Sequence, residues 1–280
     1  MPIIGFWSEE KKETAQTLSM VAFATYMAVE HNHKILVIDA TFNSDVMGKC
    51  YWIEKNKNSL IKQMNKGKID ISAGAEGLVS AMASNKITPE TIKTYSKIVF
   101  KDRLDVLLGL KTKQKEEFKK SISYYPSLLQ MAGKYYDYVF VDMTKGNDEI
   151  TQRMIKACDV VFVNLTQRLE TIDKFNNLRQ INPLFQGDNI IPLIGRYDRY
   201  SKYNTKNISR YFSNKGDKNY LSAVPYNTLF FEASNEAGVA ELFLKIRLAG
   251  DSDKNYLFVE ELKSIDKKLR YKLQELRISV

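Results

Sequence analysis

Three consecutive stretches near the start of the chain decide its fold: PIIGFWS at residues 2–8, TAQTLSMVAFATYMAVE at 14–30 and KILVIDAT at 34–41. The first and third are short and mostly apolar, with β-branched residues, as buried strands are. The second is long enough for a helix and contains neither proline nor glycine. A strand, a loop, a helix and a second strand that carries an aspartate near its end predict the first part of a parallel α/β unit.

The loop between the first strand and the helix departs from the phosphate-binding pattern. Such a unit normally carries a glycine-rich loop with a lysine before a threonine or serine, because several backbone N–H groups must converge on phosphate oxygens. Here residues 9–13 read Glu-Glu-Lys-Lys-Glu, and no glycine lies between Ser8 and Thr17. A carboxylate about 4 Å from a phosphate oxygen costs roughly 4 kcal/mol at an effective dielectric of 20. The helix N-terminus at Thr14 still offers free N–H groups and its dipole, so the loop predicts weak anion binding at most.

Apolar, β-branched runs recur along the chain with helical stretches between them. This alternation predicts a doubly wound α/β fold with a mostly parallel sheet flanked by helices. Thr88 before Pro89 is a helix start signal. No repeat, low-complexity segment or linker divides the chain, so we expect one main domain at residues 1–250. The expected strands are Ile3–Trp7, Ile35–Asp39, Leu104–Leu110, Tyr138–Asp142, Val160–Leu165, Ile190–Ile194 and Leu221–Pro225.

Hydrophobic residues make up 44% of the chain and charged residues 27%, as in a soluble globular protein. No apolar run reaches the roughly 18 residues that span a membrane. The two cysteines, Cys50 and Cys158, are too few for a disulfide framework, and no secretory signal precedes the first strand. We therefore expect a cytoplasmic protein. The net charge of +9 leaves two interpretations open. It is either a basic surface that attracts nucleic acid or anionic lipid, or a solvated lysine-rich surface with no such partner.

Residues 251–280 form a different pattern, that of a basic amphipathic helix. Leucine and isoleucine recur at spacings of three and four from Leu262 to Leu276, which predicts one apolar helix face. A helix docked on the domain, a partner-binding helix and a membrane-surface helix all satisfy this pattern. Interspersed carboxylates make the membrane contact peripheral at most. The basic residues expected to contact a partner or DNA are Lys263, Lys267, Lys268, Arg270 and Lys272.

Several segments taken together resemble the ParA/MinD family, the deviant-Walker ATPases that position DNA, division machinery and pili. Residues 34–45 (KILVIDATFNSD) look like its second strand and first switch, and 135–146 (YYDYVFVDMTKG) look like its Walker B strand and second switch. Residues 191–212 are similar to the strand and loop that frame the adenine, and 223–245 to the closing Pro-Tyr turn and helix. The resemblance implies the P-loop NTPase (SIMIBI-like) fold. Its closest branch is TadZ-like, which localises pilus and secretion machinery.

This sequence departs from the family pattern at four positions of the nucleotide site. The loop lysine aligns with Ala15 and the dimer-crossing lysine with Glu10. The water-positioning carboxylate aligns with Thr41, and the adenine-framing asparagine with Gly195. Positioning, charge neutralisation and orientation of the attacking water are therefore weakened together, and phosphoryl transfer depends on these three.

Other residues keep the places that the resemblance assigns to a nucleotide. Asp39 is the one catalytic candidate, and Asp39 and Asp142 are the candidate magnesium ligands. Lys11 and Lys12 lie close enough in sequence to replace the missing loop lysine. The remaining candidates for nucleotide binding are Thr14, Gln16, Thr17, Asp142, Arg196, Asp198 and Pro225.

From these residues we expect a pseudo-ATPase of the ParA/MinD-like, TadZ-like type, with no certain cofactor. It would act in the bacterial cytoplasm as a positioning or assembly scaffold for a pilus, secretion or similar machine. Its partners would be proteins of that machine, with a homodimer as one option. Two alternatives stay open: a partition protein of a plasmid or conjugative element that binds DNA non-specifically, and a weak ATPase that holds ATP and magnesium through an unorthodox loop.

Overall fold

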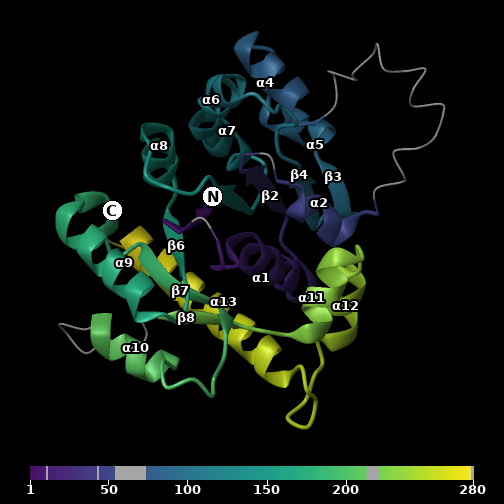
Figure 1. Cartoon of the computed structure of the whole chain (residues 1–280). Coiled ribbons are helices and arrows are strands. Elements are labelled where there is room, and N and C mark those ends of the chain that lie inside the picture. Colours follow the sequence, from purple (N-terminus) through teal and green to yellow (C-terminus); the bar gives the residue numbers. More distant parts are fainter. Residues whose placement is uncertain (11, 43, 54–73, 213–220, 279–280) are drawn as a thin grey trace.

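One eight-stranded sheet runs through the centre of the computed structural model, which describes residues 1–10, 12–42, 44–53, 74–212 and 221–278 (Figure 1). The strands are β1 (Ile3–Trp7), β2 (Ile35–Ala40), β3 (Lys97–Phe100), β4 (Leu104–Leu107), β5 (Tyr138–Met143), β6 (Val160–Leu165), β7 (Ile190–Tyr197) and β8 (Ser222–Pro225). Their order across the sheet is β3-β4-β2-β5-β1-β6-β7-β8. Every neighbouring pair is parallel except β3 and β4. The predicted doubly wound, mostly parallel α/β fold is confirmed.

One predicted strand is too long, and one strand of the sheet was not predicted. The strand expected over Leu104–Leu110 ends at Leu107. Beyond it Gly109 packs against the side chain of Asp39, so closely that an added Cβ would lie 3.0 Å from the Asp39 Cγ. The antiparallel edge strand β3 was not predicted, because two of its four residues are exposed and it carries no long apolar run.

The first helix also differs slightly from its prediction, since it begins at Gln16 and not at Thr14. Thr88 does begin a turn, as its sequence suggests. Its side chain forms a capping box with Thr91 over a short 3₁₀ turn, Pro89–Thr91, which leads directly into a helix.

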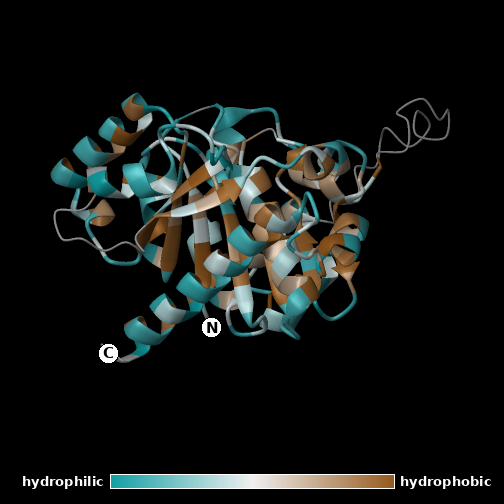
Figure 2. Cartoon of the chain, turned by 90° about the horizontal axis from the view of Figure 1, so that it is seen from below, coloured by the Kyte–Doolittle hydropathy of each residue, from teal (hydrophilic) through white to brown (hydrophobic). Residues whose placement is uncertain are grey.

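Helices cover both faces of the sheet and bury two apolar layers against it. Figure 2 shows hydrophobic residues concentrated on the central strands and on helix surfaces that face them. One face carries α4 (Ala75–Ala83), α5 (Ile92–Tyr95), α6 (Lys115–Ile122), α7 (Tyr125–Ala132), α8 (Glu149–Ala157), α9 (Leu169–Ile181) and α10 (Thr205–Phe212), with a 3₁₀ turn at Pro183–Phe185. The other face carries α1 (Gln16–Glu30), α2 (Val46–Tyr51), α11 (Thr228–Asn235), α12 (Val239–Ile246) and α13 (Tyr256–Ile278).

Helix α13 lies along the α1 side of the sheet. Leu262, Ile265 and Leu269 are fully buried there, and its last turns reach past the sheet (Figure 2). The buried carboxylate of Asp266 accepts a hydrogen bond from Arg270 at 2.7 Å and contacts the His31 ring nitrogen Nε2 at 2.9 Å. The division of the chain near residue 250 stays a prediction. Among the described residues, no helix is long and apolar enough to cross a membrane.

Candidate nucleotide-loop site

The loop between β1 and α1 lies at the carboxyl edge of the sheet, where β1, β2 and β5 end side by side. Two bonds fix its root to the segment that follows β5. The Trp7 indole N–H donates to the Gly146 carbonyl at 2.8 Å, and the Gly146 N–H donates to the Ser8 carbonyl at 3.3 Å. The Ser8 hydroxyl then accepts the N–H of Glu10 at 3.1 Å. The loop is therefore anchored at its start by side chains and backbone of this chain alone.

Two residues of the loop adopt left-handed backbone conformations without being glycine. Glu13 has φ 69° and Ala15 has φ 52°. Each such residue costs on the order of 1–2 kcal/mol, which a glycine at the same place would avoid. The loop thus keeps turns of the kind that a glycine-rich loop makes, but at a cost in stability.

Gly195 of β7 explains how the loop can lie so close to the sheet. A Cβ at this position would lie 2.1 Å from the carbonyl oxygen of Thr14 and 3.2 Å from the Cβ of Ala15. Thr14 is fully buried as a result. The absence of a side chain at Gly195 therefore lets the loop backbone approach β7.

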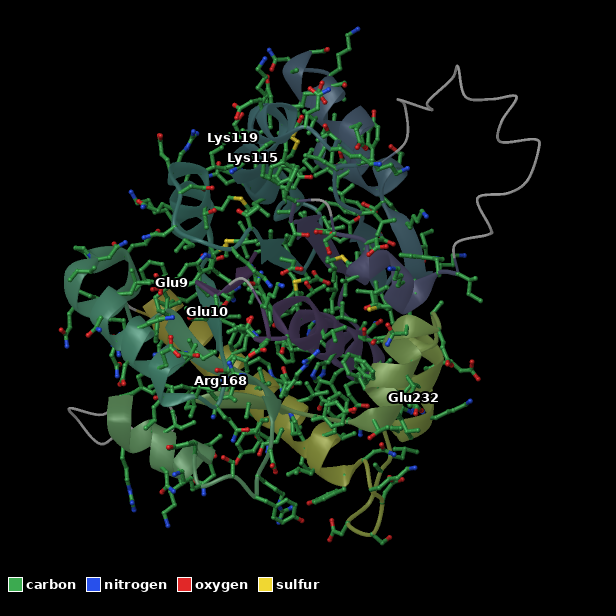
Figure 3. All side chains as sticks on the ribbon, viewed as in Figure 1. Glu9, Glu10, Lys115, Lys119, Arg168 and Glu232 are labelled. Carbon is green, nitrogen blue, oxygen red and sulfur yellow. The ribbon has the colours of Figure 1, made fainter. Side chains whose placement is uncertain are left out.

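Ion pairs connect the loop to Arg168, which precedes α9, and to Lys174 within this helix. Glu10 contacts Lys174 at 3.0 Å, and Glu13 contacts Arg168 at 2.8 Å. Burial and the neighbouring Glu10 raise the pKa of Glu9. Figure 3 shows Glu9, Glu10 and Arg168 close together at this edge of the molecule. These residues line an open dish of about 540 Å³.

The charges of this dish balance one another. Its lining consists of three carboxylates and three cations: Glu9, Glu10, Glu13, Lys12, Arg168 and Lys174. A triphosphate needs a surplus of positive charge, and two of the three cations are already paired with carboxylates of this chain. Lys12 is exposed at the rim. Lys11, the other predicted replacement for the loop lysine, lies outside the described residues.

Asp142 is fully buried and both of its carboxylate oxygens accept hydrogen bonds. The Gln16 amide nitrogen donates to Oδ1 at 2.7 Å, and the Thr17 hydroxyl donates to Oδ2 at 2.6 Å. Gln16 also donates to the Met143 carbonyl at 2.7 Å. Burial, reinforced by the nearby charge of Asp39, raises the pKa of Asp142 to about 7, against the effect of the Thr17 and Gln16 hydrogen bonds and of Lys145.

Asp39 stands next to Asp142 across the β2–β5 ladder. Its Oδ1 accepts hydrogen bonds from the Thr41 N–H at 2.9 Å and from the Thr41 hydroxyl at 2.6 Å. Burial raises the pKa of Asp39 to about 6, against the effect of these bonds and of the Gly109 backbone. Thr41 thus holds Asp39 in place and supplies no carboxylate for orienting water.

Magnesium does not fit the two aspartates as they are arranged. Mg²⁺ takes oxygen ligands in octahedral geometry, usually one or two carboxylates together with phosphates and water. Both oxygens of Asp142 are already bound to Gln16 and Thr17. In the described part of the chain, no cluster of three or more histidine, cysteine or acidic side chains could hold a metal ion.

A purine does not fit the narrow space beside the loop where the family resemblance places the base, which we call the base slot. Ala15, Arg196, Pro225 and Phe230 belong to the lining of a narrow slot beside the loop. The slot holds about 30 Å³, which is room for one or two water molecules. Of the nucleotide candidates, Arg196 and Pro225 therefore line a slot that is too small for a base.

The structure places the other predicted residues in three groups. Thr14, Gln16, Thr17, Asp39 and Asp142 lie at the carboxyl edge of the sheet, and their assignment to a nucleotide stays a prediction. Asp198 faces a separate groove with Pro225. Of the basic residues on α13, four contact this chain: Lys263 with Glu260, Arg270 with Asp266, Lys272 with Glu275, and Lys268 with the Leu221 carbonyl. Lys267 is exposed.

Sequence reasoning missed Arg168 and Lys174. Neither belongs to a recognisable motif, and Lys174 meets Glu10 across 164 positions of sequence. The only available signal was indirect, since three carboxylates in one loop call for nearby cations.

Sequence comparison matches no protein-family model and no curated protein. Comparison of structures does find similar proteins. A ParA family ATPase from Chlorobium tepidum has a TM-score of 0.67 at 15% identity, over 93% of this chain and 98% of that one. MinD in the MinC:MinD cell division complex of Aquifex aeolicus gives 0.61 at 13% identity, over 96% of each chain. A plasmid partition protein from Borrelia burgdorferi, bound to AMPPNP, gives 0.59 at 15% identity, over 97% and 99%.

These likenesses cover nearly the whole chain, at identities that show the fold alone. The chain has the fold of the ParA/MinD ATPases, with an eight-stranded, mostly parallel sheet flanked by helices.

Proposed function

We propose that this chain is a ParA/MinD-like protein that positions or assembles a larger machine in the bacterial cytoplasm without hydrolysing ATP. The observation that carries the proposal is the pairing of loop carboxylates with α9 cations, Glu10 with Lys174 and Glu13 with Arg168. The cations beside the loop that would cradle phosphate are instead paired with carboxylates of the same chain.

Three further contacts support the absence of turnover. The Gln16 side-chain amide donates a hydrogen bond to the carboxylate of Asp142. Thr41, at the position where a second carboxylate would orient water, donates a hydrogen bond to Asp39. Gly195 lets the loop backbone lie beside the base slot. Catalysis of phosphoryl transfer consists almost wholly of positioning and charge stabilisation. The bonds to Asp142 and Asp39 each satisfy a carboxylate that such catalysis would need to keep available.

Protein partners are the natural targets of such a scaffold. The MinD protein of similar fold is found in complex with MinC, and another relative in fold is a plasmid partition protein. The TadZ-like resemblance makes a pilus or secretion machine the first candidate. Without nucleotide, a homodimer would have to associate in another way than by closing around two ATP molecules.

Phosphate release during incubation with ATP and magnesium tests the absence of hydrolysis. Wild type, Asp39→Ala and Lys12→Ala should all give the same background rate. Magnesium-dependent turnover that both substitutions abolish would contradict the proposal and establish the weak ATPase.

A second candidate function is DNA partitioning, which the net charge of +9 favours. Four of the five basic α13 residues already bind groups of this chain, which reduces the charge that they offer to DNA. Binding to random duplex at 50 mM salt that falls steeply as salt is added would support partitioning. No binding at 50 mM salt would exclude it.

A further inference from the structure

A second concave surface adjoins the base slot at the carboxyl ends of β7 and β8. It encloses about 550 Å³, a volume within the range of ligand sites. Three separate segments line it: 197–200 from the end of β7, 225–226 from the end of β8, and 251–257, which leads into α13. We call it the tyrosine groove, after Tyr197, Tyr200, Tyr226 and Tyr256.

The carboxylates of the groove are held in place by neighbouring amides. The Gln167 side chain donates to the Asp198 carbonyl at 2.9 Å and accepts its N–H at 2.7 Å. The Tyr200 N–H donates to Oδ1 of Asp198 at 2.9 Å. Asn255 donates to Oδ1 of Asp253 from its backbone at 2.7 Å and from its side chain at 2.9 Å. Within the described residues, the second oxygens of Asp198 and Asp253 make no hydrogen bond, whereas the carboxylate of Asp251 is hydrogen-bonded to Tyr256.

The charge of the groove contrasts with that of the molecule. The whole chain carries +9, whereas three carboxylates and two cations line the groove, a balance of −1. The carboxylates are Asp198, Asp251 and Asp253, and the cations are Arg199 and Lys254. A cationic ligand is therefore complementary to this surface and an anionic one is not.

Aromatic rings give the groove its second property. Tyr200 is 87% exposed and Tyr226 is 54% exposed. Large rigid rings of this kind are enriched where proteins bind each other, because they contribute contact area at low entropic cost. Arg199 already shows the arrangement that such rings favour, since its guanidinium carbon lies 5.4 Å from the centroid of the Tyr200 ring.

We propose that the tyrosine groove binds an arginine-bearing segment of a partner protein. Guanidinium groups of the partner would stack on the tyrosine rings and pair with Asp198 and Asp253. Arginine fits better than lysine because its planar fork forms two parallel hydrogen bonds with one carboxylate and also stacks on a ring. The groove does not depend on the absence of ATP hydrolysis, so the two proposals stand or fall separately.

Fluorescence anisotropy of labelled peptides with the full chain tests this proposal. The probes are a nonapeptide of glycine and serine with two arginines, and matched peptides with two lysines or two glutamates. The arginine peptide should bind about threefold or more tightly than the lysine peptide, and the glutamate peptide should not bind. The double variant Asp198→Asn/Asp253→Asn should weaken the arginine peptide about tenfold.

Two further variants serve as controls. Asp188→Asn removes an exposed carboxylate before β7, outside the groove, and should bind like wild type. Tyr226→Phe keeps the ring and should retain binding, whereas Tyr226→Ala should lose most of it. Thermal unfolding of every variant checks that the fold is kept. Equal binding of the arginine and glutamate peptides, or wild-type affinity in the double aspartate variant, would overturn the proposal.

Discussion

The Gln16 amide nitrogen donates to Oδ1 of Asp142 at 2.7 Å, so a neutral side chain binds the buried carboxylate that would otherwise face a cation. Together with the Thr17 hydroxyl, it satisfies both oxygens of Asp142. Buried polar groups that are fully bonded resist exchange for a new ligand, because a ligand must first break bonds already made in a low-dielectric site. This contact links the unusual loop sequence to the absence of turnover that we propose.

The contribution of Asp39 and Asp142 to stability should fall as pH rises from about 4 to 7. The pKa values of Asp39 and Asp142 in the folded chain, about 6 and about 7, lie above their ordinary value of 3.8. Over this range these two residues bind more protons in the folded chain than in the unfolded chain, so their contribution to the free energy of unfolding decreases with pH. Asp142→Asn should remove much of this decrease. Urea unfolding at pH 5 and pH 8 measures it, with Asp173→Asn on exposed α9 as the control, and an unchanged pH slope would contradict the assignment.

Ala15→Gly should stabilise the chain by about 1 kcal/mol, because glycine adopts the left-handed conformation of residue 15 without strain. Ala22→Gly, at a buried place in the middle of α1, should instead destabilise it. Urea unfolding of both variants gives the comparison. A loss of stability in Ala15→Gly would show that the loop is not strained there.

Gly195→Ala should cost about 1–3 kcal/mol of stability, because its Cβ would lie 2.1 Å from the Thr14 carbonyl oxygen and backbone would have to move. Gly250→Ala is the matched control, since a Cβ there meets no atom within 4 Å and should change stability by less than about 0.5 kcal/mol. Thermal or urea unfolding distinguishes the two. Equal effects would mean that the loop does not press against β7.

The double variant Glu10→Gln/Glu13→Gln should gain weak anion binding while keeping its stability. It removes the carboxylate that pairs with Arg168 and one of the two carboxylates that pair with Lys174. The dish is then left with surplus positive charge. Exposed ion pairs contribute little, so Tm should move by less than about 3 °C. Titration with inorganic phosphate measures the gain. Glu236→Gln/Glu241→Gln, which removes two carboxylates near α12, is the control that should gain nothing.

Some elements could be predicted because the sequence expresses their burial directly. β1 and β6 match their predicted bounds, since every residue of each is buried and the runs are continuous. β3 could not be predicted, because it is an edge strand of four residues, two of them exposed, and has no such run.

The residue types of the loop could be read from the sequence, but the contacts that these residues make could not. The missing glycines are visible in the sequence, but the left-handed turns at Glu13 and Ala15 follow from how the loop is held, which no local pattern encodes. The same holds for the pair formed by Glu10 and Lys174, whose partners are far apart along the chain.

Calorimetric titration with ATP, ADP and a non-hydrolysable analogue, each with magnesium, tests the central claim most directly. We predict no heat of binding up to millimolar nucleotide, because the loop charges are paired and Asp142 is already bonded. Micromolar binding would contradict the account, since it would show that the loop opens and still cradles phosphate.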